Sequence, residues 1–273
     1  MIRLVSSKTL VASFAYHDVT DRPGESGLQR PGAAPYTLGV AAFERHLDAI
    51  AAGPVRPERV TAIDPTAPGR HLLLTFDDGG KSAVHAADAL SQRGWRGHFF
   101  IITERIGERT FLDAAEIRYL HRSGHVIGSH SHTHPEIFRE QTVTQMVAEW
   151  RTSCERLADL LGEACTVASV PGGDISPRVL ESAGEAGLSF LFTSEPTLAP
   201  QSVNGCWVMG RYCPKVTTHP ARIGALAQFH GWGRAMFMRR CKDFLRVVLP
   251  GPYRRYAHRQ ARELGPVSPV TGR

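Results

Sequence analysis

The stretch that decides the fold of this 273-residue chain is HLLLTFDDGG, residues 71–80. Its leucines and threonine form the short apolar run that is typical of a buried strand. Two adjacent carboxylates, Asp77 and Asp78, follow the run, and the next two glycines let the backbone turn sharply. In parallel α/β folds, catalytic groups gather at this end of a strand. A simple turn that caps a helix gives the same letters, because Asp-Gly is a common turn dipeptide.

Fifty residues further on, three histidines stand within five positions in the stretch HVIGSHSHTHPEI, residues 125–137. Imidazole is the commonest protein ligand for zinc and related metals, which take nitrogen and carboxylate donors. His130 and His134 share a face if the segment is helical, and His132 joins them if it is extended. The spacing therefore predicts a metal site and leaves open which histidines bind. A single histidine would indicate core packing instead.

The two motifs together, TFDDG followed by H-S-x-x-H, resemble those of the polysaccharide deacetylase family, also called the NodB-homology domain. The resemblance implies that Asp77 is the catalytic base and that Asp78, His130 and His134 hold a divalent metal. Zinc is the metal expected, with cobalt or nickel as alternatives. His132 falls at an unassigned position of the pattern.

The resemblance extends over roughly residues 11–215. AYHDV (residues 15–19) and FERHLDAI (residues 43–50) are similar to segments of deacetylases encoded with exopolysaccharide biosynthesis. SVPGG (residues 169–173) stands where the third motif of the family belongs. On this basis we assign substrate contacts to His17, Pro171, Gly172 and Arg211.

The chain departs from the family pattern at two places. The third motif usually begins with an arginine that orients the base, and here Ser169 stands there; a serine donates one hydrogen bond but supplies no charge. The last motif usually carries a general-acid histidine in a Leu-x-His setting, and no such tripeptide follows Ser194. His17, His219 and His230 are the candidates for that acid. Arg211 is a candidate cation near the site.

Strands alternate with helices along most of the chain, which predicts parallel βαβ units. About seven such units favour a barrel, and the resemblance implies the distorted (β/α)7-type barrel of the NodB-homology domain. We place this barrel in residues 1–220 and a basic helical extension, packed on it or flanking it, in residues 221–273. Besides those named above, the predicted strands are 10–16, 98–103, 166–170, 188–193 and 206–209. The predicted helices are 40–52, 81–93, 113–122, 142–161, 177–187, 221–229, 232–249 and 253–264.

Composition is ordinary for a soluble globular protein, with 42% hydrophobic and 21% charged residues. The five cysteines are dispersed without a CxxC pair, which is typical of a reducing compartment. The N-terminal residues do not form a convincing signal peptide, and no apolar run is long enough to span a membrane. We therefore expect a cytoplasmic protein.

The basic charge is concentrated at the end of the chain. Residues 221–273 hold 11 of the 32 Lys and Arg residues and 2 of the 26 acidic residues. A solvated basic face accounts for this excess most simply. The alternative is contact with anionic lipid at the inner membrane face or with an acidic polysaccharide. No motif for nucleic-acid binding accompanies the charge.

The function predicted from these observations is metal-dependent removal of N-acetyl or O-acetyl groups from a surface polysaccharide, an exopolysaccharide or its precursor. One alternative is a protein of the same fold that binds carbohydrate without turnover. The other is an unrelated metal-dependent phosphoesterase that uses the histidine cluster.

Overall fold

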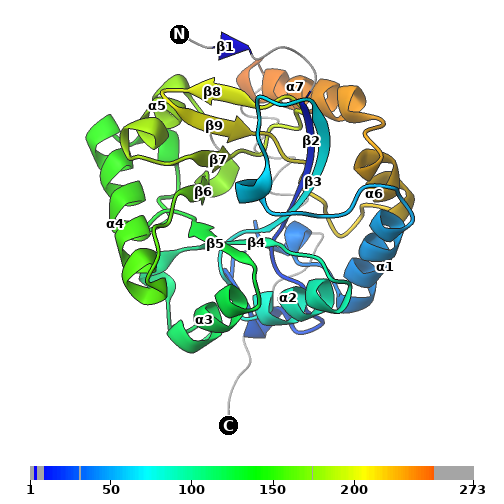
Figure 1. Ribbon diagram of the computed structural model, residues 1–273, viewed down its shortest axis with the longest axis horizontal. Helices are drawn as coiled ribbons and strands as arrows, with labels where there is room; N and C mark the ends of the chain where they lie inside the picture. Colours follow the sequence, from blue (N-terminus) through cyan, green and yellow to red (C-terminus); the bar gives the residue numbers. More distant parts are fainter. Residues whose placement is uncertain (1–2, 5–8, 31, 174, 249–273) are drawn as a thin grey trace.

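The computed structural model describes residues 3–4, 9–30, 32–173 and 175–248. Strands and helices alternate through most of this part, and the strands lie inside a ring of helices (Figure 1). The strands are β1 (Arg3–Leu4), β2 (Thr9–Tyr16), β3 (Gly69–Phe76), β4 (His98–Ile101), β5 (Val126–Ser129), β6 (Val167–Ser169), β7 (Phe190–Phe192), β8 (Gln201–Val203) and β9 (Cys206–Met209). The helices are α1 (Val40–Ala51), α2 (Ala83–Gln92), α3 (Ala114–Arg122), α4 (Val143–Leu161), α5 (Pro177–Glu185), α6 (Pro220–Ala227) and α7 (Trp232–Val248).

The sheet is mostly parallel, with the order β1-β8-β9-β7-β6-β5-β4-β3-β2. All pairings from β2 to β9 through the centre are parallel, whereas β8 and β1 add antiparallel strands beyond β9. The outer parallel strands also meet each other. Tyr212, just after β9, forms a parallel bridge with Phe14 of β2 and exchanges backbone hydrogen bonds of 2.8 and 2.9 Å with Ser13 and Ala15. The sheet is therefore curled into the distorted barrel that the sequence predicts.

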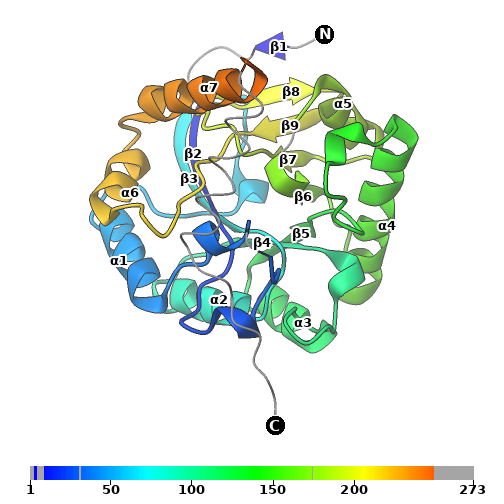
Figure 2. The same ribbon diagram turned by 180° about the vertical axis from the view of Figure 1, so that it is seen from behind.

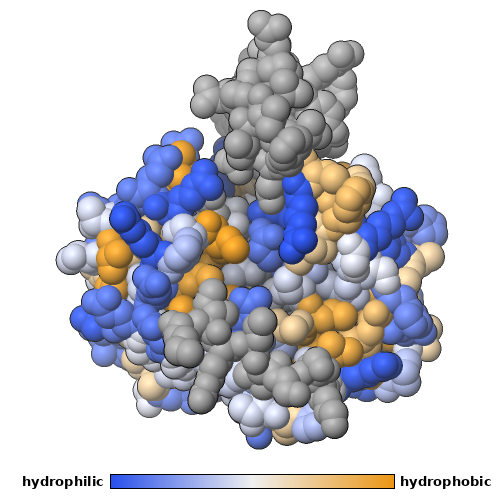
Figure 3. Space-filling view, turned by 90° about the horizontal axis from the view of Figure 1, so that it is seen from above, coloured by the Kyte–Doolittle hydropathy of each residue, from blue (hydrophilic) through white to orange (hydrophobic). Residues whose placement is uncertain are grey.

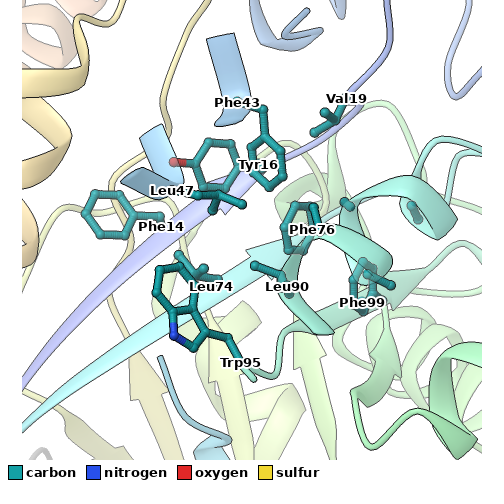
Figure 4. Close-up of a cluster of buried hydrophobic side chains, with 14 of the residues drawn as sticks. Phe14, Tyr16, Val19, Phe43, Leu47, Leu74, Phe76, Leu90, Trp95 and Phe99 are labelled. Atoms are coloured by element: carbon teal, nitrogen blue, oxygen red, sulfur yellow. The ribbon is translucent and has the colours of Figure 1, made fainter. Parts of the chain in front are cut away.

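An aromatic ladder on three neighbouring strands fixes their register next to the aspartates. Tyr16 pairs with Phe76, and Phe76 pairs with Phe99, so the three side chains share one face. The ring of Phe76 stacks on Tyr16 at 5.7 Å and on Phe99 at 4.8 Å between centroids (Figure 4). Because Tyr16 and Phe76 are the last residues of their strands, His17 and Asp77 leave the sheet at the same level.

Two capping boxes fix the starts of the helices that flank the histidine segment. Thr142 and Gln145 form one of them at the start of α4. Asp113 and Glu116 form a second one at the start of α3, which the sequence analysis did not identify.

The C-terminal helices contribute to the same core as the barrel. Ile223 and Leu226 of α6 are fully buried in the largest hydrophobic cluster, together with Trp232 at the start of α7. The ring of Trp232 lies 6.2 Å from that of Phe14 in β2. Figure 2 shows α6 and α7 lying against the barrel beside α1 and β2. The predicted domain boundary at residue 220 stays a prediction.

Most predicted elements are present with ends within a few residues of the expected ones. The sequence analysis missed the short antiparallel strands β1 and β8, and the predicted helix 253–264 lies outside the described residues. In the face that Figure 3 shows, hydrophobic surface is divided into separate patches among hydrophilic residues. Within the part of the chain that the structure describes, no helix has both the length and the apolar character needed to cross a membrane.

Candidate metal centre and catalytic site

The chemically important side chains come from the carboxyl ends of five parallel strands. His17 follows β2, the two aspartates follow β3, and His130 follows β5. Ser169 ends β6, and Arg211 comes two residues after β9. Because these strands are parallel, their carboxyl ends meet at one rim of the barrel. The fold thus brings together residues that lie up to almost 200 positions apart in the chain.

Asp78, His130 and His134 converge with one donor atom each, and these three atoms lie within 4.8 Å of one another. The Oδ1 atom of Asp78 is 3.3 Å from Nε2 of His130 and 3.8 Å from Nε2 of His134. Ligand atoms around a tetrahedral zinc ion are about 3.4 Å apart, given bonds of about 2.1 Å. The donor types and their spacing therefore fit a divalent cation.

The orientation of His130 is set by Ser169. Nδ1 of His130 lies 3.0 Å from the carbonyl oxygen of Ser169 and 2.6 Å from its hydroxyl oxygen. If Nδ1 carries the proton and donates it there, Nε2 keeps its lone pair and faces Asp78. A second hydrogen bond of this kind is the usual support of a metal-binding histidine.

The loop that carries His134 is tied to helix α4. The carboxylate of Glu149 accepts hydrogen bonds of 2.8 Å from the backbone N–H groups of His132 and Thr133, and one of 2.7 Å from the Thr133 hydroxyl. His134 itself has a left-handed φ of 55°, and Asp78 has a φ of 76°. Non-glycine residues rarely adopt this conformation, and such strain gathers at functional sites.

Asp77 contributes no donor atom to this cluster and is held by Arg211. The guanidinium donates from Nη1 to Oδ1 at 2.7 Å and from Nη2 to Oδ2 at 2.8 Å. Arg211 also donates to the hydroxyl of Thr75 at 2.9 Å and to the carbonyl of Thr193 at 2.9 Å. Ser169 adds a hydrogen bond of 3.1 Å to Oδ1 of Asp77. Arg211 has no exposed surface, so it is a partner of Asp77 and does not face a substrate directly.

Electrostatics keep both carboxyl groups ionised. Burial raises the pKa of Asp77, but the charges of Arg211 and His130 outweigh burial and hold this pKa below its ordinary value. The pKa of Asp78 is also lowered, because its contact with His130 and the nearby charge of His17 outweigh burial. Burial and the charge of His130 lower the pKa of His134 to about 4. Asp78 and His134 are therefore in the forms that bind a metal at neutral pH.

His17 lies near both aspartates, since its charge contributes to lowering the pKa of each. Its Nδ1 atom is buried and has no hydrogen-bond partner among the described residues. The ring packs 5.1 Å from that of Tyr36. Of the other acid candidates, His219 caps helix α6 with Nδ1, and His230 is exposed beyond the end of that helix.

Three further residues from the sequence analysis have distinct positions. His132 turns to Thr103, whose hydroxyl oxygen lies 3.0 Å from Nδ1, and so does not join the donor cluster. Pro171 is buried directly after β6. Gly172 is exposed, with a left-handed φ of 62°. The spacing in the sequence could not separate His132 from its neighbours, because the loop is neither a helix nor a strand.

The central part of the chain is similar in sequence to known proteins. Residues 64–191 match the family model for polysaccharide deacetylases. A putative polysaccharide deacetylase, YxkH of Bacillus subtilis, is 27% identical over 129 residues, which are 47% of this chain and 46% of that protein. The peptidoglycan-N-acetylglucosamine deacetylase PgdA of Listeria monocytogenes is 25% identical over 128 residues, which are 46% of this chain and 26% of that protein. The match thus spans less than half the length of these relatives.

Solved structures share the fold over a longer part of the chain. A polysaccharide deacetylase from Bacillus cereus superposes with a TM-score of 0.68 at 18% identity, covering 80% of this chain and 69% of that one. IcaB from Ammonifex degensii gives 0.65 at 22% identity, covering 81% and 97%. The family match includes Asp77, Asp78, His130 and His134 but ends before Arg211. Residues 64–191, which contain both motifs, thus match the model of the polysaccharide deacetylase family that these motifs resemble.

Proposed function

We propose that this protein is a metal-dependent deacetylase that hydrolyses N-acetyl groups, with O-acetyl groups as the alternative, of a surface polysaccharide, an exopolysaccharide or its precursor. The observation that carries the proposal is the convergence of one carboxylate and two imidazoles beside a second, separately held carboxylate. Hydrolysis of an acetyl group needs an activated water, stabilisation of the oxyanion and a proton for the leaving group. The site offers residues for each of these tasks.

Asp78, His130 and His134 are the residues that would hold the metal, for which zinc is the best match and cobalt or nickel are alternatives. When bound, a divalent cation would polarise the acetyl carbonyl and lower the pKa of water. Ser169 fixes the ring of His130 through Nδ1, and Glu149 fixes the loop of His134. These contacts hold the donor atoms in place before any ligand arrives.

Asp77 is the base in this proposal. Oδ1 of Asp77 already accepts hydrogen bonds from Arg211 and Ser169, whereas Oδ2 accepts one from Arg211 alone. A carboxylate oxygen has two acceptor positions, so Oδ2 retains one for the proton of the attacking water. Arg211 then takes the place of the arginine that Ser169 replaces in the third motif, with a guanidinium supplied by a different strand.

We assign the proton for the leaving group to His17. Its buried Nδ1 has no partner in the described part of the chain, and it stands at the same rim as the aspartates. An imidazolium group can donate a proton to a departing amine. Replacing His17 by Gln should lower kcat by about a hundredfold and leave metal content unchanged.

The direct test is acetate release from acetylated oligosaccharides with zinc, cobalt or no metal. Asp77→Asn should abolish turnover and keep the metal, whereas His130→Ala should lose both. Near-normal activity of Asp77→Asn would show that the base is wrongly assigned. Absence of acetate release from every substrate and metal would favour the carbohydrate-binding alternative. Hydrolysis of a generic phosphoester by the wild type, lost in His130→Ala, would favour the phosphoesterase alternative.

A second proposal concerns the first turns of α7. Phe237 and Met238 are 65% and 61% exposed, and the neighbouring Arg234 and Arg240 are exposed as well. We propose that this face rests on anionic lipid, where apolar side chains enter the interface and arginines meet the headgroups. In sedimentation with phosphatidylglycerol vesicles, the double variant Phe237→Ser/Met238→Ser should lose its binding to the vesicles. The control variant Ile137→Ser, at an exposed residue elsewhere, should keep it. Equal binding by both variants would contradict the proposal.

A further inference from the structure

An open hollow of about 280 Å³ lies between the loop after β2 and the segment that follows β4. One wall consists of residues 27–30 in the loop after β2, and the other is formed by residues of the segment 105–111. The proposed chemistry uses none of these residues. The position and the charge of these lining residues nevertheless connect them with the candidate metal centre.

The second wall connects both segments that carry the metal-ligand candidates. At one end, the N–H of Glu104 donates to the carbonyl of His132 at 3.0 Å. At the other end, the N–H of Leu112 donates to the carbonyl of Gly79 at 2.9 Å. Residues 104–112 therefore span from the histidine loop to the turn that follows Asp78. One wall of the hollow is therefore part of the segment that joins the two halves of the candidate site.

The first wall is held firmly against the second. The N–H of Gly27 donates to the carbonyl of Thr110 at 2.8 Å, and the Thr110 hydroxyl donates back to the carbonyl of Gly27 at 3.0 Å. Gly27 has a φ of 65°, and a Cβ atom there would clash with the carboxylate of Asp18. Asp18 is itself buried and accepts hydrogen bonds from the hydroxyls of Ser26 and Ser82. The hollow is thus built into the loop structure.

The charge of the hollow is positive. Arg30 and Arg105 both line it, and Glu108 pairs with Arg105 at 3.1 Å. Within the described part of the chain, no carboxylate lies at ion-pair distance from Arg30. An exposed guanidinium without a counter-charge beside a site is suited to a planar anion.

We propose that this hollow is a subsite for an anionic group, a carboxylate or a phosphate, on the sugar next to the acetylated one, and that Arg30 recognises it. This inference rests on the proposed deacetylase function, for which it specifies an acidic substrate. Arg105 contributes less, because Glu108 neutralises its charge. The subsite therefore discriminates substrates through one residue.

The test compares binding of three oligosaccharides of equal length. One is neutral and made of N-acetylglucosamine, one alternates N-acetylglucosamine with glucuronate, and one carries a phosphate on the adjacent sugar. Isothermal titration of the full chain at low salt measures each affinity. The wild type should bind at least one anionic form about fivefold more tightly than the neutral form. The two anionic arms show which group is preferred.

Arg30→Gln should remove this preference and leave the affinity for the neutral oligosaccharide unchanged. Arg109→Gln is the matched control, because Arg109 is exposed in the same segment but does not line the hollow. Equal affinity of the wild type for all three oligosaccharides would overturn the inference, as would equal losses in the two variants. Charge-dependent binding without acetate release would refute the deacetylase and keep the subsite. Acetate release without any charge preference would refute the subsite and keep the deacetylase.

Discussion

In the proposed mechanism, a single ion pair takes the place of the arginine that the third motif of the family usually carries. Arg211 and Asp77 are fully or almost fully buried and joined by two parallel hydrogen bonds. The rings of Phe100 and Phe192 flank the guanidinium at 5.8 Å. A charged pair in such surroundings depends on its geometry, since either partner alone would be a buried, uncompensated charge.

Arg211→Lys should lower kcat at least tenfold with little change in KM or metal content. Lysine keeps the charge but cannot form the two parallel hydrogen bonds that orient Asp77. Arg211→Ala should lose more activity, and added guanidinium should restore part of it by entering the vacated space. Steady-state kinetics and metal analysis check both statements. Wild-type kcat in Arg211→Lys would contradict the positioning role.

The sequence analysis identified the candidate residues of the site better than it identified their hydrogen-bond partners. The aspartates and histidines lie in short motifs, so their chemistry could be recognised locally. The pairing of Asp77 with Arg211 joins residues 134 positions apart, and no local pattern encodes it. Ser169 was noted as a departure from the family pattern, but its contact with His130 depends on how β5 and β6 align.

At the scale of elements, helix α4 supports the site from outside. Glu149 accepts three hydrogen bonds from the histidine loop, which has no regular structure of its own. Glu149→Gln should weaken zinc binding about tenfold or more, as loss of an outer-shell partner does. Competition with a chromogenic chelator measures the affinity. Glu155→Gln, on an exposed part of the same helix, should have wild-type affinity; the same loss in both variants would contradict the anchoring role.

Buried histidines next to the strands make stability depend on pH. Burial lowers the pKa of His98 and of His125 to about 4. Nε2 of His98 accepts a hydrogen bond of 2.8 Å from the N–H of Val60, which requires the neutral ring. As pH falls from 6.5 towards 4, the unfolded chain takes up protons that the folded chain does not, so the free energy of unfolding decreases.

His98→Gln removes one of these two groups. Between pH 7 and pH 5 the wild type should lose about 2 kcal/mol more of its free energy of unfolding than this variant, from about 1.4 kcal/mol per pH unit below 6.5. Urea unfolding of metal-free protein at both pH values measures the difference. Parallel pH profiles for the two proteins would show that His98 does not titrate as described.

At the scale of the whole molecule, the barrel is closed by contacts between its two ends, and the C-terminal helices cover that junction. Tyr212 bridges to β2, and Trp232 packs on Phe14 of the same strand. The indole N–H of Trp232 donates to the carbonyl of Leu226 at 2.9 Å. The sequence predicted these helices and placed them on the barrel or beside it, but it did not indicate which of their side chains join the barrel core.

Trp232→Ala should therefore destabilise the protein by about 3–5 kcal/mol, because it leaves a cavity at the junction. Phe237→Ala, in the same helix but largely exposed, should change stability by less than about 0.5 kcal/mol. Denaturant midpoints of the two variants check the contrast. Equal midpoints would mean that α7 lies apart from the core.

The most direct measurement of the central claim is anomalous diffraction at the zinc edge from crystals grown with zinc. We predict one peak at the rim of the barrel, about 2.0–2.2 Å from Oδ1 of Asp78 and from Nε2 of both His130 and His134, with Asp77 outside the coordination sphere. A peak bound to other residues, or zinc-soaked crystals with no peak at these three side chains, would contradict the account.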